Sequence, residues 1–327
     1  MDTSYRQKVT PRMIFSRYFN SKILLFGEYS IIHHSMGLAV PYDLFQGRLV
    51  FRQVTQVSPK IMHSNRELKA FADYIKHESE AGNLATRFDM TSLEFDLEQG
   101  LYFESTIPQG FGLGSSGALT ASLYDRYAIG KTTFRGRKPT MEEILELKIN
   151  FAKLESHFHG SSSGFDPLIC YLDTPLLIRS KEAIEATEIP DFQGGNGTVF
   201  LLNTARPRRT EPLVNLFLEK CNNPSFMDAC KNDLIPHNDE AIRSFLSGDS
   251  EDLFTHVKAI SEFQQRYFQP MIPSLFRKVW KDGLDSDAYY LKLCGAGGGG
   301  FILGFTRDFE KTKHLLSRQQ VRSVYEL

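Results

Sequence analysis

A glycine-rich segment at residues 108–118 constrains this chain more than any other feature. It reads Pro-Gln-Gly-Phe-Gly-Leu-Gly-Ser-Ser-Gly-Ala, and residues 118–127 continue with good helix formers and no breaker. Glycine permits the backbone conformations in which successive N–H groups turn toward an anion, and a helix N-terminus adds the positive end of its dipole. The segment predicts a phosphate-binding loop followed by a helix that begins near Ser116. The alternative is a loop that merely turns the chain, so other segments of the sequence are needed to distinguish the two interpretations.

Apolar runs around this loop are typical of β-strands. Residues 23–26, 38–41 and 47–51 are short apolar segments joined by tight connections. Between residues 93 and 97 apolar and acidic side chains alternate, which predicts a strand with one face in water. The expected order is therefore strand, glycine loop and helix, which is the context that an anion-binding loop needs.

The clearest helix is predicted to begin at Thr140. Glu143 stands three residues on, as in a capping box, and apolar residues recur at intervals of three and four before Gly160 ends the pattern. Glu155 lies beside this apolar stripe, so we expect its carboxylate near the edge of a buried surface. A solvated flank charge is the alternative.

Composition and charge exclude several classes of protein. The chain has 327 residues, 41% hydrophobic and 24% charged, which is ordinary for a soluble globular protein with room for two cores. Its 38 basic and 39 acidic residues give a net charge of −1, so no overall field favours nucleic acid or an acidic membrane. The four cysteines form no CxxC pair. Because no membrane-spanning or signal-peptide pattern is found, we expect a cytoplasmic protein without nucleic-acid or membrane partners.

A second glycine cluster, at residues 194–197, precedes the apolar strand expected at residues 199–202. It predicts a domain boundary, with an N-terminal nucleotide-binding domain at residues 1–194 and a C-terminal domain at residues 195–327. The second half carries helical patterns near residues 213–217, 241–246 and 253–263. It also contains a third glycine segment, residues 295–300, which we expect to pack close to the loop at residues 108–118.

Three segments together resemble the motifs of the GHMP kinases, a family named for galactokinase, homoserine kinase, mevalonate kinase and phosphomevalonate kinase. These segments are residues 22–34, 108–118 and 295–300, in the family's order and at comparable separations. The resemblance covers nearly the whole chain. It implies an α+β, two-domain GHMP kinase fold, with an N-terminal domain like ribosomal protein S5 domain 2 and a ferredoxin-like C-terminal domain. It also implies ATP and Mg²⁺ as cofactors, a small-molecule substrate, and a monomer or homodimer.

Residues 155–167, which read Glu-Ser-His-Phe-His-Gly-Ser-Ser-Ser-Gly-Phe-Asp-Pro, look like the form of this segment in the mevalonate kinase branch. The resemblance implies that Glu155 and Ser116 hold Mg²⁺ and that Asp166 takes the proton from the attacking hydroxyl. Lys22 would stabilise that hydroxyl or the transferring phosphoryl group. These roles suit phosphoryl transfer, which depends on charge neutralisation and positioning more than on covalent chemistry.

The same resemblance assigns further residues to ligands. The residues expected to bind the nucleotide lie in the glycine loop and at the start of its helix: Pro108, Gly110, Gly112, Leu113, Gly114, Ser115, Ser116 and Gly117. The residues expected to bind the acceptor substrate are Glu28, Tyr29, His33, Thr210 and Gly297.

One departure from the family concerns the acceptor. The first motif usually contains Gly-Glu-His, whereas Tyr29 here follows Gly27 and Glu28. Three arginines at positions 206, 208 and 209 are placed to bind a substrate phosphate, the carboxylate of mevalonate or the phosphates of ATP, or to remain solvated. The favoured reaction is ATP-dependent phosphorylation of the primary hydroxyl of mevalonate. The alternatives are a phosphomevalonate or sugar kinase, a related decarboxylase, and a non-catalytic sensor that binds a nucleotide or sugar.

Overall fold

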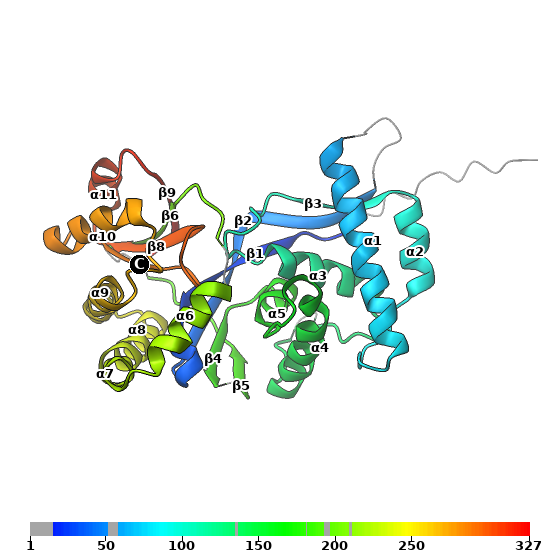
Figure 1. Cartoon of the computed structure of the whole chain (residues 1–327), viewed down its shortest axis with the longest axis horizontal. Helices are drawn as coiled ribbons and strands as arrows, with labels where there is room; N and C mark the ends of the chain where they lie inside the picture. The colour runs from blue at the N-terminus through cyan, green and yellow to red at the C-terminus, as the bar shows by residue number, and fades with distance from the viewer. Residues whose placement is uncertain (1–15, 52–57, 135–136, 181, 193–196, 209–210) are drawn as a thin grey trace, which may run out of the picture.

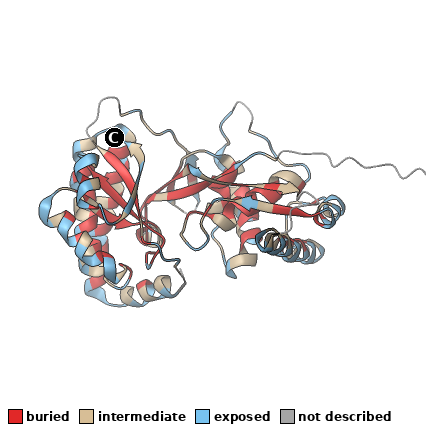
Figure 2. Cartoon of the chain, turned by 90° about the horizontal axis from the view of Figure 1, so that it is seen from above, coloured by how far each residue is buried: buried red, intermediate tan, exposed pale blue. Residues whose placement is uncertain are grey.

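The computed structural model describes residues 16–327 except 52–57, 135–136, 181, 193–196 and 209–210. Two antiparallel β-sheets organise the described chain (Figure 1). Their inner faces and the helices against them carry the buried residues, which run through both halves of the molecule (Figure 2). None of the described helices is long and apolar enough to cross a membrane.

The first sheet has the order β1-β2-β4-β5, and β3 also pairs with β2. Its strands are β1 (Phe19–Phe26), β2 (Gly37–Phe51), β3 (Leu101–Ser105), β4 (Leu176–Ser180) and β5 (Ala183–Ala186). The strands predicted at residues 23–26, 38–41 and 47–51 are confirmed, and the last two belong to the single long strand β2. Leu113 accepts a backbone hydrogen bond of 3.0 Å from Lys22 in β1, which ties the glycine loop to this sheet.

Within the described residues, five helices accompany the first sheet, and α3, α4 and α5 pack on one another beside it (Figure 1). They are α1 (Pro59–Glu80), α2 (Met90–Glu98), α3 (Ser115–Tyr127), α4 (Met141–His159) and α5 (Phe165–Leu172). The predicted capping box is present, because the Thr140 hydroxyl accepts from the Glu143 N–H and the Glu143 carboxylate accepts from the Thr140 N–H. Burial of Ile144, Leu147 and Phe151 then fixes the face of α4 that meets its neighbours.

The strand predicted at residues 93–97 is wrong, because this segment lies in helix α2. Leu93 and Leu97 are buried, while Phe95 between them is 57% exposed. Positions four apart share a face in a strand and also in a helix, so the alternating pattern suits both. Asp89 favours the helix, because its carboxylate caps the N-terminus of α2 by accepting from the Ser92 N–H at 3.0 Å.

The second sheet has the order β7-β8-β6-β9. Its strands are β6 (Thr198–Asn203), β7 (Tyr290–Leu293), β8 (Phe301–Thr306) and β9 (Gln320–Glu326). The accompanying helices are α6 (Glu211–Cys221), α7 (Pro224–Ala229), α8 (Ile235–Ser247), α9 (Ser250–Tyr267), α10 (Ser274–Ser286) and α11 (Phe309–Leu315). A 3₁₀-helix, η1 (Ser30–His33), follows β1, and a π-helix, η2 (Cys230–Leu234), precedes α8.

Aromatic side chains join the two sheets. The ring of Phe26 at the end of β1 lies 5.7 Å from Phe305 in β8 and 6.2 Å from Phe245 in α8, centroid to centroid. The end of β1 therefore enters the second half of the molecule and carries the first motif with it. The domain boundary predicted at residue 194 falls among residues outside the described chain and stays a prediction.

Candidate active site

The glycine loop connects β3 to α3 in a conformation that its glycines make possible. Gly110, Gly112 and Gly114 have φ angles of 76°, 78° and 77°, in the left-handed region that side chains disfavour. Gly114 is the N-cap of α3 and provides no side-chain cap. Because the first N–H groups of a helix have no acceptor within it, this first turn presents donors to an anion. Its geometry suits the predicted phosphate binding.

The remaining predicted nucleotide-binding residues share this loop and turn. Pro108 and Leu113 lie in the loop, and Leu113 is fully buried. Ser115, Ser116 and Gly117 form the first turn of α3. A side chain at Gly117 would place its Cβ 2.7 Å from the carbonyl carbon of Asp166, so this glycine lets α3 and α5 approach closely.

Lys22 and Asp166 form an ion pair beside the start of α3. The Lys22 Nζ and the Asp166 Oδ1 lie 2.8 Å apart, with the lysine side chain 10% exposed and the aspartate 33% exposed. Lys22 comes from β1, whereas Asp166 stands in the first turn of α5 after the left-handed N-cap Gly164. The backbone of α4 leaves no room for a side chain at Gly164. A catalytic pair predicted from separate motifs is thus brought into direct contact.

The lysine of this pair is held in its charged form. Burial would lower the pKa of Lys22, but the charge and hydrogen bond of Asp166 act in the opposite direction and the net shift is upward. A cation therefore stands beside the carboxylate that we predict to be the base.

Glu155 and Ser116 are also brought together. The Ser116 hydroxyl donates to the Glu155 Oε1 at 2.9 Å, and the Ser162 hydroxyl donates to the other carboxylate oxygen at 2.5 Å. Burial, supported by the negative charge of Asp166, raises the pKa of Glu155 to about 7. His159 approaches from the other side, with its Nε2 at 3.0 Å from the Ser116 hydroxyl oxygen. Glu155 is 4% exposed, which fits the prediction that it lies at a buried surface.

The chemistry of these groups fits Mg²⁺. This ion prefers oxygen ligands and is usually held by one or two protein groups together with substrate phosphates and water. Glu155 and Ser116 provide a carboxylate and a hydroxyl within hydrogen-bonding distance of each other, at the loop that we expect to bind phosphate.

Arg208 adds a second cation, from the loop after β6. Its backbone N–H donates to the Gly110 carbonyl at 2.9 Å, and its Nη1 donates to the Cys294 carbonyl at 2.5 Å. The guanidinium occupies the space that side chains at Gly112 and Gly295 would need. Arg208 therefore lies between the second and third glycine segments, and the sequence had left its place open among several alternatives.

The third glycine segment packs against the glycine loop as predicted. A Cβ at Gly300 would lie 2.6 Å from the Phe111 carbonyl oxygen and 2.9 Å from its Cα. The Gly300 N–H donates to the Arg206 carbonyl at 2.6 Å. Close contact between the two segments therefore depends on the absence of a side chain here.

Several residues predicted to bind the acceptor are engaged with the protein. Glu28 is paired with Lys292 in the interior, and the Tyr29 hydroxyl donates to the Ala296 carbonyl at 2.6 Å. His33 ends η1 with its Nε2 3.2 Å from the Cys221 Sγ. Gly297 has φ 75° and packs against the Met271 carbonyl. Thr210 lies outside the described residues, and the acceptor roles of all five residues stay predictions.

Two polar side chains of this region escaped the sequence analysis. Ser162 orients Glu155 and also accepts the Gly164 N–H at 3.0 Å, but it is one of three consecutive serines that sequence cannot rank. Lys292 interrupts the otherwise apolar end of β7. The sequence signal that could have indicated Lys292 is a lysine in an apolar strand that leads directly into a glycine segment.

Comparison with known proteins shows which proteins this chain is similar to. Residues 69–174 match the family described as "GHMP kinases N terminal domain". A mevalonate kinase from Thermococcus sibiricus is 27% identical over 194 residues, which cover 54% of this chain and 56% of that relative. The chain thus spans little more than half the length of the curated relative that it matches.

Solved structures share the architecture. A mevalonate kinase from L. major in complex with R-mevalonate has a TM-score of 0.63 at 16% identity, covering 94% of this chain and 92% of that one. A phosphomevalonate kinase from Streptococcus pneumoniae in complex with phosphomevalonate and AMPPNP has a TM-score of 0.58 at 14% identity, covering 95% of this chain and 100% of that one.

Residues 69–174 thus match the N-terminal domain of the GHMP kinases, and the described chain has an α+β fold like that of the solved mevalonate kinase and phosphomevalonate kinase structures. The T. sibiricus relative and the L. major structure are both mevalonate kinases, the branch whose form of residues 155–167 this sequence resembles.

Proposed function

We propose that this protein transfers the γ-phosphoryl group of ATP to the primary hydroxyl of mevalonate. The observation that carries the proposal is the 2.8 Å pairing of Lys22 with Asp166 against the first turn of α3. A base and a cation beside a phosphate-binding loop are what phosphoryl transfer to an alcohol requires. The acceptor assignment is supported by the likeness to a mevalonate kinase from T. sibiricus and to a structure that contains R-mevalonate.

Asp166 acts as the base in this proposal. The acceptor oxygen forms a bond to the γ-phosphorus while the bond from that phosphorus to the bridging oxygen of ADP breaks, and the hydroxyl proton passes to the Asp166 carboxylate. One third of the Asp166 side chain is exposed, so an acceptor can reach it. A positioned base of this kind contributes about 10²-fold to 10⁴-fold to the rate.

Lys22 and Arg208 supply positive charge where negative charge accumulates on the transferring group. Lys22 remains charged beside Asp166, as its raised pKa indicates. Arg208 is held at the glycine loop by the Gly110 and Cys294 carbonyls. Because a guanidinium presents several donors in one plane, it suits two phosphate oxygens at once.

Glu155 and Ser116 would hold Mg²⁺, and Ser162 keeps the Glu155 carboxylate oriented. When bound, Mg²⁺ neutralises charge on the β- and γ-phosphates. The N–H groups of the glycine loop and of the first turn of α3 would bind the phosphates.

The proposal is tested by ADP release from Mg-ATP with mevalonate, phosphomevalonate, galactose and homoserine assayed in parallel. Release with mevalonate alone is expected. Asp166→Ala should lower turnover by about 10²-fold or more while leaving the Kd of ATP nearly unchanged, because the carboxylate acts on the acceptor proton. Release with a different acceptor alone would contradict the mevalonate assignment, and no release with any acceptor would favour a nucleotide-binding sensor.

Phosphomevalonate is the second candidate acceptor, and one observation favours it. Arg208 places a guanidinium between the two glycine segments, and in a phosphomevalonate kinase this cation would bind the phosphate carried by the substrate. The acceptor panel separates the two candidates directly.

A further inference from the structure

Glu28 and Lys292 form an ion pair in the interior of the molecule. The Lys292 Nζ and the Glu28 Oε2 lie 2.6 Å apart, and each side chain is only 1% exposed. Lysine and glutamate are almost never buried to this extent unless they are paired. Removing two charges from water is costly, and a well-packed apolar pair often stabilises a protein equally well. Net stability alone is therefore a poor explanation for this pair.

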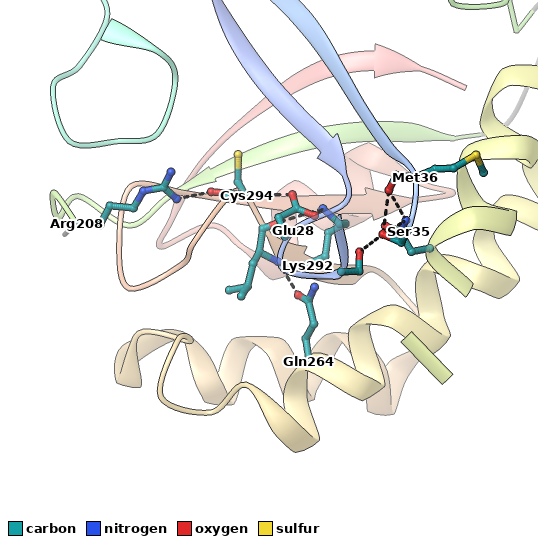
Figure 3. A network of polar contacts seen from close by, with 11 residues as sticks. Glu28, Ser35, Met36, Arg208, Gln264, Lys292 and Cys294 are labelled. Carbon is teal, nitrogen blue, oxygen red and sulfur yellow. Dashed lines mark hydrogen bonds and ion pairs between the residues drawn. The ribbon is translucent and has the colours of Figure 1, made fainter. Parts of the chain in front are cut away.

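The other bonds of these residues lead into the third glycine segment (Figure 3). The Glu28 Oε1 accepts from the Gly295 N–H at 3.4 Å, and the Lys292 Nζ donates to the Leu293 carbonyl at 3.0 Å. The hydroxyl of Tyr29, the neighbour of Glu28, donates to the Ala296 carbonyl. Glu28 and Tyr29 of the first motif, together with Lys292, therefore hydrogen-bond to the backbone of residues 293–296, where β7 leads into the glycine segment.

The opposite side of this backbone carries Arg208. Its Nη1 donates to the Cys294 carbonyl at 2.5 Å, between the residues that Glu28, Tyr29 and Lys292 hold. Figure 3 shows Arg208 and Lys292 on either side of Cys294. Because the guanidinium also abuts Gly112 of the glycine loop, a shift of residues 293–296 would move the guanidinium relative to that loop, while the Arg208 N–H stays bonded to the Gly110 carbonyl.

We propose that Glu28 and Lys292 are positioning residues whose buried ion pair fixes the backbone of residues 293–296 and so holds Arg208 at the glycine loop. The proposal rests on the proposed function for its kinetic consequence. Glu28, expected from the sequence to meet the acceptor, acts in this account from within the protein. The pair acts through backbone carbonyls and through Arg208, and it does not touch the reacting atoms.

The decisive experiment separates positioning from stability. The double variant Glu28→Leu with Lys292→Met removes both charges but keeps apolar volume, so we expect a thermal midpoint close to that of the wild type. Amide hydrogen exchange in peptides that cover residues 291–302 should be at least tenfold faster than in the wild type. With Mg-ATP and mevalonate, kcat should fall at least tenfold. The Kd of ATP should change less than about threefold, because the N–H groups of residues 108–118 still bind the phosphates and the Arg208 charge acts on the group in transfer.

A matched control removes a second ion pair far along the chain from the glycine segment. Arg126 and Asp96 lie 2.7 Å apart with side chains 16% and 15% exposed, and they join α3 to α2. The double variant Arg126→Met with Asp96→Leu should keep kcat within about twofold and leave exchange at residues 291–302 unchanged.

Wild-type exchange and wild-type kcat in the Glu28 and Lys292 double variant would overturn the proposal. If this double variant does not fold, Glu28→Gln takes its place under the exchange and kcat criteria, because glutamine keeps the shape and one acceptor while losing the charge. Its thermal midpoint is expected to fall, because Lys292 is left without its charge partner. If the wild type phosphorylates no acceptor, the proposed function fails. The exchange measurement still decides whether the pair holds the glycine segment.

Discussion

Glu155 should make the unfolding free energy of the metal-free protein decrease with rising pH, and the substitution Glu155→Gln tests this prediction. It is buried in α4, and its pKa is raised from 4.5 to about 7. Between these two values the folded protein retains a proton that the unfolded chain has released. Stability therefore falls as the pH rises through this window, and the loss is complete above about pH 7.

The size of the effect follows from the two pKa values. A rise from 4.5 to about 7, at roughly 1.4 kcal/mol per pH unit, corresponds to about 3 kcal/mol of unfolding free energy. Most of this loss falls between pH 5 and pH 8. Glutamine at position 155 does not titrate, and its carbonyl can still accept a hydroxyl proton. The unfolding free energy of Glu155→Gln minus that of the wild type should therefore rise by about 2 to 3 kcal/mol from pH 5 to pH 8.

The assay is denaturant unfolding of both proteins at pH 5, 6, 7 and 8, in EDTA so that divalent ions do not bind the carboxylate. Other titrating groups are common to both proteins, so the difference removes the contribution of those that do not interact with Glu155. Glu146→Gln, at an exposed position of the same helix, is the matched control for the loss of one carboxylate from α4. A constant difference for Glu155→Gln, or one that shifts in favour of the wild type as pH rises, would refute the reasoning.

Three further substitutions test separate parts of the account. Gly117→Ala places a Cβ 2.7 Å from the Asp166 backbone, so α3 and α5 must separate; denaturation should show a loss of about 1 to 3 kcal/mol, with reduced ADP release, and an unaltered enzyme would contradict this packing. Thr140→Ala removes the capping box of α4 and should cost about 1 kcal/mol of stability with kcat unchanged, whereas equal stability would mean that the cap is dispensable. Lys22→Met removes the cation beside Asp166 and should lower turnover by about 10²-fold or more in the ADP assay; near-normal turnover would exclude Lys22 from the chemistry.

The parts of the fold that sequence predicted are those with local signals. The Thr140 cap, the loop at residues 108–118 and the helix after it each depend on neighbours within a few residues, where spacing and residue type determine backbone geometry. The helix α2 was mistaken for a strand because Leu93 and Leu97 satisfy both periodicities, and the exposure of Phe95 depends on packing that sequence does not show.

In the candidate site too, residues in local motifs can be predicted from sequence, whereas contacts between distant residues cannot. Lys22, Ser116, Glu155 and Asp166 are predicted as site residues because they stand in recognisable motifs. The structure brings them together, and their roles stay predictions. The partner of Glu28 is 264 residues away along the chain, and no local pattern distinguishes a buried ion pair from a residue that faces a substrate. Contacts of this kind arise from the packing of the two sheets.

The most direct test of the central claim is to observe the product. Phosphorus NMR of the wild-type protein with Mg-ATP and mevalonate should show ADP and a new phosphomonoester in equal amounts. The Asp166→Ala variant should form that ester at least about 10²-fold more slowly while still binding ATP. ADP that appears with inorganic phosphate and no ester, or an ester formed equally fast by the variant, would contradict the account.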